Sequence, residues 1–223
     1  MYAPAELNAR GAICAPSFLP PEEIEEFVKI FAAREAARPG ERLEVKSVAD
    51  RPQIARVTSL LRKYLGESAR PVRVIAFDKH SQNNWFLSWH QDRTIEVKRR
   101  AEVEDYGPWT RKQGRLHVSP PFAVIERMLT VRMHVDAVDE ANAPLLIAPG
   151  SHKAGVILET QISSVVDRCG VQTCLAEAGD IWIYSTPILH ASKRAVGQRR
   201  RRVLQIDYAA FDLPAGLEWA ADD

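Results

Sequence analysis

The sequence has few cysteines and no long apolar run, and each absence narrows the class of protein. Its three cysteines (Cys14, Cys169 and Cys174) form neither an even set nor a cluster with zinc-ligand spacing, so we expect free thiols in a reducing cytoplasm. No apolar run approaches the roughly 20 residues of a membrane span, so we expect no membrane partner. Residues 1–19 also lack the charged-then-apolar pattern of a secretion signal.

The chain also lacks an excess of charge of either sign. Its 30 basic residues balance 29 acidic ones, and the net charge of +1 gives no reason to expect a nucleic-acid partner. Internal repeats and low-complexity segments are absent as well. The remaining composition is that of an ordinary globular protein, and 223 residues predict a single domain, 1–223, with a sizeable core. The sequence indicates no oligomeric state.

The segment from about residue 20 to residue 66 predicts a helical support for a sheet. A first helix begins near Pro20 and carries an apolar stripe at helical spacing: Ile24, Phe27, Val28 and Phe31. The polar stretch 33–46 is expected to be a loop. Asp50 and Gln53 then predict a capping box for a second helix, which ends at Gly66. Two helices are therefore expected before any strand.

From Arg70 the pattern changes to short strands separated by turn signals, which favours a β-sandwich or barrel over about 70–210. The strands are expected at 72–77, 85–92, 129–136, 144–148, 181–184 and 202–208. The strand 129–136 alternates cleanly, so its polar face, with Arg132 and His134, could line a pocket. His134 could bind substrate there, or it could be a hydrogen-bonded structural histidine.

Residues 93–127 interrupt this pattern with a charged segment that shows little regular period. We expect a long inserted loop. Such a loop beside a reactive site is often a lid or a binding loop, but a tolerated surface excursion is an equally good interpretation.

The tetrapeptide Trp89-His90-Gln91-Asp92 carries the strongest chemical signal. In an extended strand the side chains of His90 and Asp92 point to the same face, so an imidazole and a carboxylate can converge on one metal ion. A third ligand from elsewhere would complete the 2-His-1-carboxylate arrangement of non-heme Fe(II) oxygenases. Taken alone, a His-x-Asp tripeptide arises often by chance.

Two residues further along the chain support this hypothesis. His190 lies 100 positions after His90 and could be the third ligand. Arg201 follows it by eleven positions and opens the last strand. A 2-oxo acid bound to iron needs a cation for its far carboxylate, and an arginine binds a carboxylate through two parallel hydrogen bonds.

With these motifs the sequence resembles the phytanoyl-CoA dioxygenase family of Fe(II)/2-oxoglutarate oxygenases. The resemblance covers about 70–208 and includes 142–145, 149–153 and 178–180 besides the motifs above. It implies a double-stranded β-helix (a cupin-like jelly roll) that uses Fe(II), 2-oxoglutarate and O2. It implies iron ligation by His90, Asp92 and His190, with Arg201 and Ser192 holding the distal carboxylate of 2-oxoglutarate.

The resemblance also implies roles for Arg132 and Lys79, which match positions that contact cosubstrate or substrate in relatives. Ala143 replaces a glycine that is usual in the family, so that turn is expected to differ. Asp92 favours hydroxylation with release of succinate and CO2, because halogenating relatives replace this carboxylate. The substrate is expected to be a small molecule, and Lys79, Lys98 and Arg99 hint at an anionic group on it.

Three alternatives stay open at this point. A cupin-like metalloenzyme that does not use 2-oxoglutarate would have no need of Arg201. A non-catalytic relative would keep the fold and bind metal or ligand without turnover. The run of arginines at 199–202 could bind nucleic acid, although in a strand only half of these side chains share a face.

Overall fold

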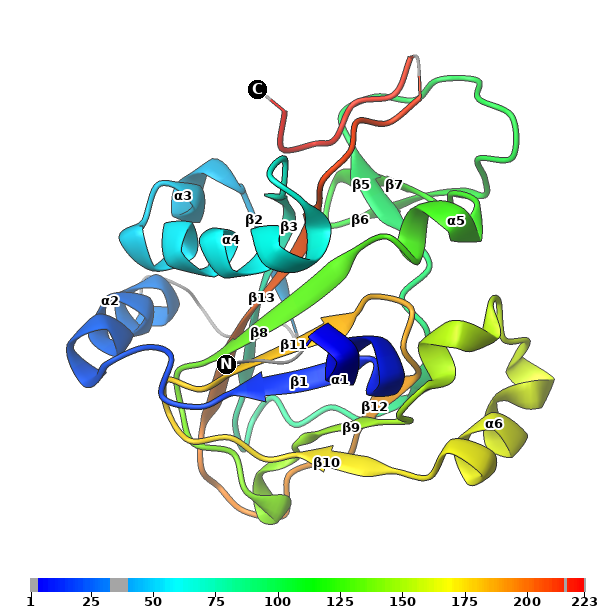
Figure 1. Ribbon diagram of the computed structural model, residues 1–223. Helices are drawn as coiled ribbons and strands as arrows, with labels where there is room; N and C mark the ends of the chain where they lie inside the picture. The colour runs from blue at the N-terminus through cyan, green and yellow to red at the C-terminus, as the bar shows by residue number, and fades with distance from the viewer. Residues whose placement is uncertain (1–3, 33–39, 215, 223) are drawn as a thin grey trace.

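The computed structural model describes residues 4–32, 40–214 and 216–222, and two antiparallel sheets form its centre (Figure 1). The main sheet has six strands in the order β1-β11-β8-β13-β3-β2. Their bounds are Ala12–Ala15 (β1), Ile181–Ser185 (β11), Leu129–His134 (β8), Arg201–Ala209 (β13), Arg70–Lys79 (β3) and Glu41–Leu43 (β2).

The second sheet has four strands in the order β10-β9-β12-β4. Their bounds are Gln172–Cys174 (β10), Leu145–Ile147 (β9), His190–Ser192 (β12) and Leu87–His90 (β4). The two sheets form a jelly roll, and the predicted fold class, mainly β with flanking helices, is confirmed.

Helices cover the outer face of the main sheet. Figure 1 shows α2, α3 and α4 together on one side of this sheet, while α6 lies beside the four-stranded sheet. The helix bounds are Pro4–Arg10 (α1), Pro21–Ala32 (α2), Lys46–Ala49 (α3), Pro52–Leu65 (α4), Phe122–Ile125 (α5) and Ile162–Cys169 (α6). Among the described residues, no helix combines the length and apolar character needed to cross a membrane.

Strand alternation separates an apolar face of the main sheet from a polar one. Val131 and Met133 of β8 belong to the largest core cluster, together with Phe27 of α2 and Ile54 of α4. Arg132, between them, points to the other face and lines a cavity between the two sheets. The predicted alternation of this strand is confirmed, and it gives the cavity a polar wall on one side.

The N-terminal part differs from the prediction in three ways. The stripe of the first helix is confirmed in α2, but β1 precedes that helix and β2 lies within the predicted loop. The predicted capping box is wrong, because Asp50 ends α3 and Arg51 precedes α4 without a side-chain cap. Pro52 occupies the first turn of α4, where its missing N–H costs nothing, and the helix therefore starts later than expected. The residues 33–39 of the predicted loop lie outside the described residues.

The segment 93–127 is not the irregular loop that its composition predicts. It contains a three-stranded antiparallel sheet in the order β5-β7-β6, with bounds Ile95–Val97 (β5), Arg115–Val118 (β7) and Trp109–Lys112 (β6). Its apolar residues pack with the chain end around Trp219, which is buried. The alternation of apolar and polar residues is hard to recognise in these short strands, because many of their side chains are charged and only one narrow face of the sheet is buried.

Candidate metal centre

Two neighbouring strands of the four-stranded sheet bring three potential metal ligands together. His90 ends β4 and His190 begins β12, and the register pairs the two residues directly. Asp92 follows β4 by two residues. One ligand atom from each of the three side chains lies within 4.8 Å of the other two, which is the spacing that a single metal ion requires. The structure thus brings together the residues that the sequence suggested as metal ligands.

Backbone carbonyls orient both imidazole rings. Nδ1 of His90 lies 2.8 Å from the carbonyl oxygen of Ser88, and Nδ1 of His190 lies 2.9 Å from that of Ile188. A carbonyl oxygen only accepts, so Nδ1 donates in both rings and Nε2 keeps its lone pair for a metal. Burial and the neighbouring His90 lower the pKa of His190 to about 4, which keeps this ring neutral and able to ligate.

Gln91, between the two ligands, points the opposite way and anchors the segment. Its amide nitrogen donates to the carbonyl oxygens of Gly155 (3.0 Å) and Pro187 (2.9 Å). Its amide oxygen accepts from the backbone N–H of Ile157 at 2.9 Å. Because both ends of its amide group are hydrogen-bonded, Gln91 fixes the backbone on either side of it. His90, at the end of the strand, and Asp92, beyond it, are therefore held in place.

A buried ion-pair network supports Asp92 from behind. Arg73 of β3 lies 3.8 Å from Asp92 and 2.5 Å from Asp207, and Asp207 also accepts a hydrogen bond from Thr130 at 3.0 Å. Burial opposes ionisation of Asp92, but nearby positive charge, chiefly that of Arg73, outweighs it and lowers the pKa of this carboxyl. Asp92 therefore presents a carboxylate to the metal position. No sequence motif points to Arg73, which shares one face of β3 with the apolar residues Ile75 and Phe77.

The ligands face a cavity of about 250 Å³ between the two sheets, and two arginines line its far wall. Arg132 donates to the side-chain oxygen of Gln205 at 3.2 Å, and Arg201 donates to the carbonyl oxygen of Ala143. The Nε atoms of both arginines are buried and lack a hydrogen-bond partner. Among the described residues, neither guanidinium has a carboxylate partner. Such a pair of charges fits an anion that carries a carboxylate, so the cavity suits 2-oxoglutarate beside the metal.

The four consecutive arginines at 199–202, where the last strand begins, differ in their partners. Three of them pair with aspartates: Arg199 with Asp139, Arg200 with Asp78 and Arg202 with Asp136. Only Arg201 turns inward. The run is therefore neutralised on the protein itself, which weakens its interpretation as a nucleic-acid patch.

Ser192 and Ala143 complete the wall around Arg201. The hydroxyl of Ser192 donates to the carbonyl oxygen of Ala143 at 3.2 Å and lies 3.4 Å from Arg201. Ala143 has φ 53° and ψ 57°, a left-handed conformation that glycine adopts more easily than alanine. The turn aims its carbonyl oxygen at both partners, so alanine is accommodated at this position at some steric cost.

Two residues that the sequence suggested for ligand binding, Lys79 and His134, do not line the cavity. The ammonium of Lys79 donates to the carbonyl oxygens of Trp85 and Lys193, each at 2.8 Å, and it is fully buried. His134 is buried too, and burial together with Arg132 and Arg201 holds its pKa well below the usual value, so its ring is neutral. Neither residue is among those that line the cavity.

The cations near the mouth of the cavity are not those suggested by the sequence. Lys98 and Arg99 directly follow β5 and pair with Glu218, at 3.8 and 2.8 Å. The structure instead brings Arg42 of β2 and Lys112 of β6 into the cavity lining. Sequence reasoning missed both, because one lies in a predicted loop and the other in a predicted insertion.

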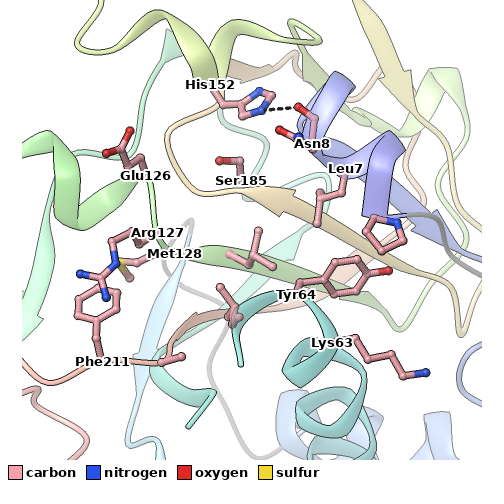
Figure 2. Close-up of a pocket in the computed structure, with 14 residues that line it drawn as sticks. Leu7, Asn8, Lys63, Tyr64, Glu126, Arg127, Met128, His152, Ser185 and Phe211 are labelled. Carbon is pink, nitrogen blue, oxygen red and sulfur yellow. Dashed lines mark hydrogen bonds between the residues drawn. The ribbon is translucent and has the colours of Figure 1, made fainter. Parts of the chain in front are cut away.

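A second cavity of about 440 Å³ lies where β8 begins and β11 ends (Figure 2). It is bordered by α1, the end of α4 and the turn before β8. His152 lies at its edge and bonds through Nε2 to the carbonyl oxygen of Asn8 at 3.2 Å, as Figure 2 shows. This contact fastens α1 to the turn at 149–153 and supports a structural role for His152.

A jelly roll that holds two histidines and one carboxylate around an open cavity defines the class of mononuclear non-heme iron oxygenases. The chain belongs to the phytanoyl-CoA dioxygenase (PhyH) family, whose model matches residues 7–203. This family depends on Fe(II), 2-oxoglutarate and O2. No match to a curated protein was found.

Solved structures share the fold at low sequence identity. EctD from S. alaskensis in complex with 2-oxoglutarate and 5-hydroxyectoine has a TM-score of 0.68 at 17% identity, with coverage of 93% of this chain and 74% of EctD. HygX from Streptomyces hygroscopicus with nickel, 2-oxoglutarate and hygromycin B bound has a TM-score of 0.62 at 16% identity, with coverage of 92% and 86%. The epimerase SnoN in complex with Fe3+, alpha ketoglutarate and nogalamycin RO has a TM-score of 0.66 at 14% identity, with coverage of 96% and 89%.

Proposed function

We propose that the protein is an Fe(II)- and 2-oxoglutarate-dependent dioxygenase that hydroxylates a C–H bond of a small organic substrate. In this reaction one atom of O2 enters succinate as CO2 is released, and the other enters the substrate. His90, Asp92 and His190 would hold the iron. The observation that carries the proposal is the pair of buried, uncompensated guanidinium groups of Arg132 and Arg201 across the same cavity.

The protein residues have separate tasks in this proposal. Three protein ligands leave room for the cosubstrate on an octahedral metal. Arg201, assisted by Ser192, would bind the distal carboxylate and so set the orientation of the keto acid. Arg132 would add a second positive charge on the same side. The neighbouring structures support this assignment, because HygX and SnoN were each solved with a metal and the 2-oxo acid bound.

The proposal extends to where the protein works and what it acts on. All three cysteines are free, which supports the reducing environment of the cytoplasm. HygX binds hygromycin B and EctD binds 5-hydroxyectoine, and these ligands support a small-molecule substrate here. Asp92 keeps the third protein ligand in place, which supports hydroxylation rather than halogenation.

The test is O2-dependent formation of succinate from 2-oxoglutarate by the Fe(II)-loaded protein, with and without candidate substrates. We expect succinate from the wild-type protein and none from His190→Ala, because two ligands hold iron poorly. The control His80→Gln changes a histidine outside the cavity and should retain turnover. Iron binding with O2 consumption but no succinate would instead favour the cupin-like metalloenzyme, and iron binding with neither would favour a non-catalytic relative.

A further inference from the structure

A second group of cations enters the cavity from the side opposite Arg132. The register of the main sheet places Arg42 of β2 beside Ile75 of β3, and Ile75 beside Gln205 of β13. Gln205 in turn lies beside Arg132. With about 4.8 Å between strands, the backbones of Arg42 and Arg132 are about 14 Å apart, at the two ends of one row. The two guanidinium groups thus approach the metal position from opposite ends of this row.

The direct hydrogen-bond partner of Arg42 is a neutral histidine, and the nearby carboxylates of Glu96 and Asp92 act on its charge only through longer distances. Its Nε donates to Nε2 of His117 at 3.3 Å, and Nδ1 of His117 donates to the carbonyl oxygen of Arg115 at 3.1 Å. Burial, along with nearby cations, lowers the pKa of His117 to about 4, so the ring is uncharged and Nε2 accepts. The remaining nitrogens of Arg42 have no carboxylate partner among the described residues.

The hairpin of the three-stranded sheet brings a second cation to the same place. Gln113, at the β6–β7 turn, accepts from the backbone N–H of Arg42 at 2.9 Å and donates to the carbonyl oxygen of Gly40 at 2.6 Å. These two bonds tie the hairpin to β2, and the preceding residue, Lys112, lines the cavity. Lys112 also lacks a carboxylate partner within the described part of the chain.

Arg42 and Lys112 line the same cavity, and their positive charges repel each other. Partial burial lowers the pKa of Lys112, and Arg42 and Arg73 lower it further, whereas Asp92 opposes the shift. Arg73 is already paired with Asp207. Arg42 and Lys112 therefore repel each other in the empty protein, and an anion bound between them would offset this repulsion.

We propose that Arg42 and Lys112 form a subsite for an anionic group, a carboxylate or a phosphate ester, on the substrate that is oxidised. The inference rests on the proposed function, because it assigns the opposite end of the cavity to 2-oxoglutarate. In the register of the main sheet, Ile75 and Gln205 lie between the two ends. Lys112 is exposed, so the subsite lies toward the mouth, where a substrate would enter after the cosubstrate. A volume of about 250 Å³ shared with 2-oxoglutarate restricts the buried part of the substrate to a small group.

The experiment uses the full chain loaded with Mn(II), a paramagnetic ion that takes nitrogen and oxygen ligands, together with saturating 2-oxoglutarate. Broadening of the ligand proton NMR signals by the metal reports binding near it. The probes are propionate, methyl phosphate and the uncharged propionamide. We expect both anions to be broadened and propionamide not. Tighter binding of methyl phosphate would assign a phosphate ester, and tighter binding of propionate would assign a carboxylate.

Variants distinguish this subsite from the cosubstrate site. Arg42→Ala and Lys112→Ala should each weaken binding of the anions at least about tenfold and leave broadening of 2-oxoglutarate itself unchanged. The matched control Arg99→Ala removes an exposed cation outside the cavity and should change neither. Equal broadening of propionate and propionamide, or unchanged anion binding in both variants, would overturn the subsite. Absence of 2-oxoglutarate broadening in the wild-type protein would instead contradict the proposed function.

Discussion

Two buried arginines of the same cavity, Arg73 and Arg201, differ in how their charge is balanced. Arg73 contacts two carboxylates, Asp207 and Asp92, and donates to the carbonyl oxygen of Thr94 at 3.1 Å. Arg201 has no carboxylate partner among the described residues, one of its nitrogens has no partner at all, and burial and the neighbouring Arg132 lower its pKa to about 9. Both side chains are almost fully buried, at 5% and 2% exposure.

The difference indicates which charges maintain the fold and which are available to bind a ligand. A buried charge whose partners are all in the protein stabilises a fixed geometry, and here that geometry is the position of Asp92. A buried charge without a counter-ion costs free energy in the empty protein, and an anionic ligand can restore it on binding. On this basis Arg73 belongs to the scaffold of the cavity, and Arg201 belongs to a binding site.

The largest expected effect on stability comes from removing Asp207, the carboxylate closest to Arg73. Asp207→Ala leaves Arg73 buried beside Asp92 alone, and we expect the free energy of unfolding to fall by about 3–5 kcal/mol. Urea unfolding of the apoprotein measures this change. The control Asp212→Ala removes an exposed partner of Arg70 and should leave the free energy nearly unchanged. Equal effects of the two substitutions would contradict a structural role for the Arg73 network.

A smaller effect is expected from Lys79, whose charge is repelled by Arg201 and Arg132. Burial, Arg201 and Arg132 lower its pKa in the folded protein to about 7, below the value of about 10.5 expected in the unfolded chain. Between these values the unfolded chain binds more protons, so the stability contributed at this site rises as pH increases. Between pH 7 and pH 9 the wild-type protein should gain on the order of 2 kcal/mol relative to Lys79→Met.

The measurement for Lys79 is urea unfolding of both proteins at pH 7, 8 and 9, because the difference between them cancels the other titrating groups. Saturating the protein with a dianion such as 2-oxoglutarate should flatten the difference, since the repulsion by Arg201 is then neutralised. A difference that is constant with pH would show that the carbonyl oxygens of Trp85 and Lys193 keep Lys79 charged throughout.

Arg201→Met tests the difference between Arg201 and Arg73 through the free energy of unfolding. Removing an uncompensated buried charge should leave the free energy of unfolding of the apoprotein unchanged or raise it by about 1–2 kcal/mol. The same unfolding assay that detects the loss in Asp207→Ala checks this. A loss of similar size to that of Asp207→Ala would mean that Arg201 is part of the scaffold, held by Ala143 and Ser192.

The smallest effect is expected in the turn that supports Arg201. Ala143→Gly relieves the left-handed backbone and should raise the free energy of unfolding by up to about 1 kcal/mol, less than the full steric cost because glycine makes the unfolded chain more flexible. The change in melting temperature, with Ala141→Gly as a control outside the left-handed region, measures it. A destabilised Ala143→Gly protein would show that the turn carries no such cost.

The sequence predicted the reactive residues better than the segments that surround them. The sequence indicates His90, Asp92, His190 and Arg201 because their spacing is demanding and each lies at a strand terminus or within two residues of one. The alternation of 129–136 likewise placed Arg132 on the polar face. These features depend on local periodicity, which a single sequence displays.

The residues that the sequence missed depend on contacts between distant segments. Arg42 reaches the cavity only because the three residues of β2 pair with β3, and Lys112 only because Gln113 ties the β6–β7 turn to β2. Pairings of this kind leave no local pattern in short, charged segments. Lys79 was given a binding role that its two carbonyl partners oppose, since the sequence cannot tell an inward-facing cation from one bonded to the backbone.

The most direct measurement is an anaerobic titration of the Fe(II)-loaded protein with 2-oxoglutarate, followed by its visible absorption. Chelation of iron by the keto acid gives a weak charge-transfer band that neither component shows alone. We expect the band in the wild-type protein, its loss in Asp92→Ala, and an affinity about 30- to 100-fold lower in Arg201→Met, equivalent to about 2–3 kcal/mol. A wild-type protein that binds iron without forming the band, or an Arg201→Met protein with undiminished affinity, would contradict the assignment of Arg201 as the anchor of the cosubstrate.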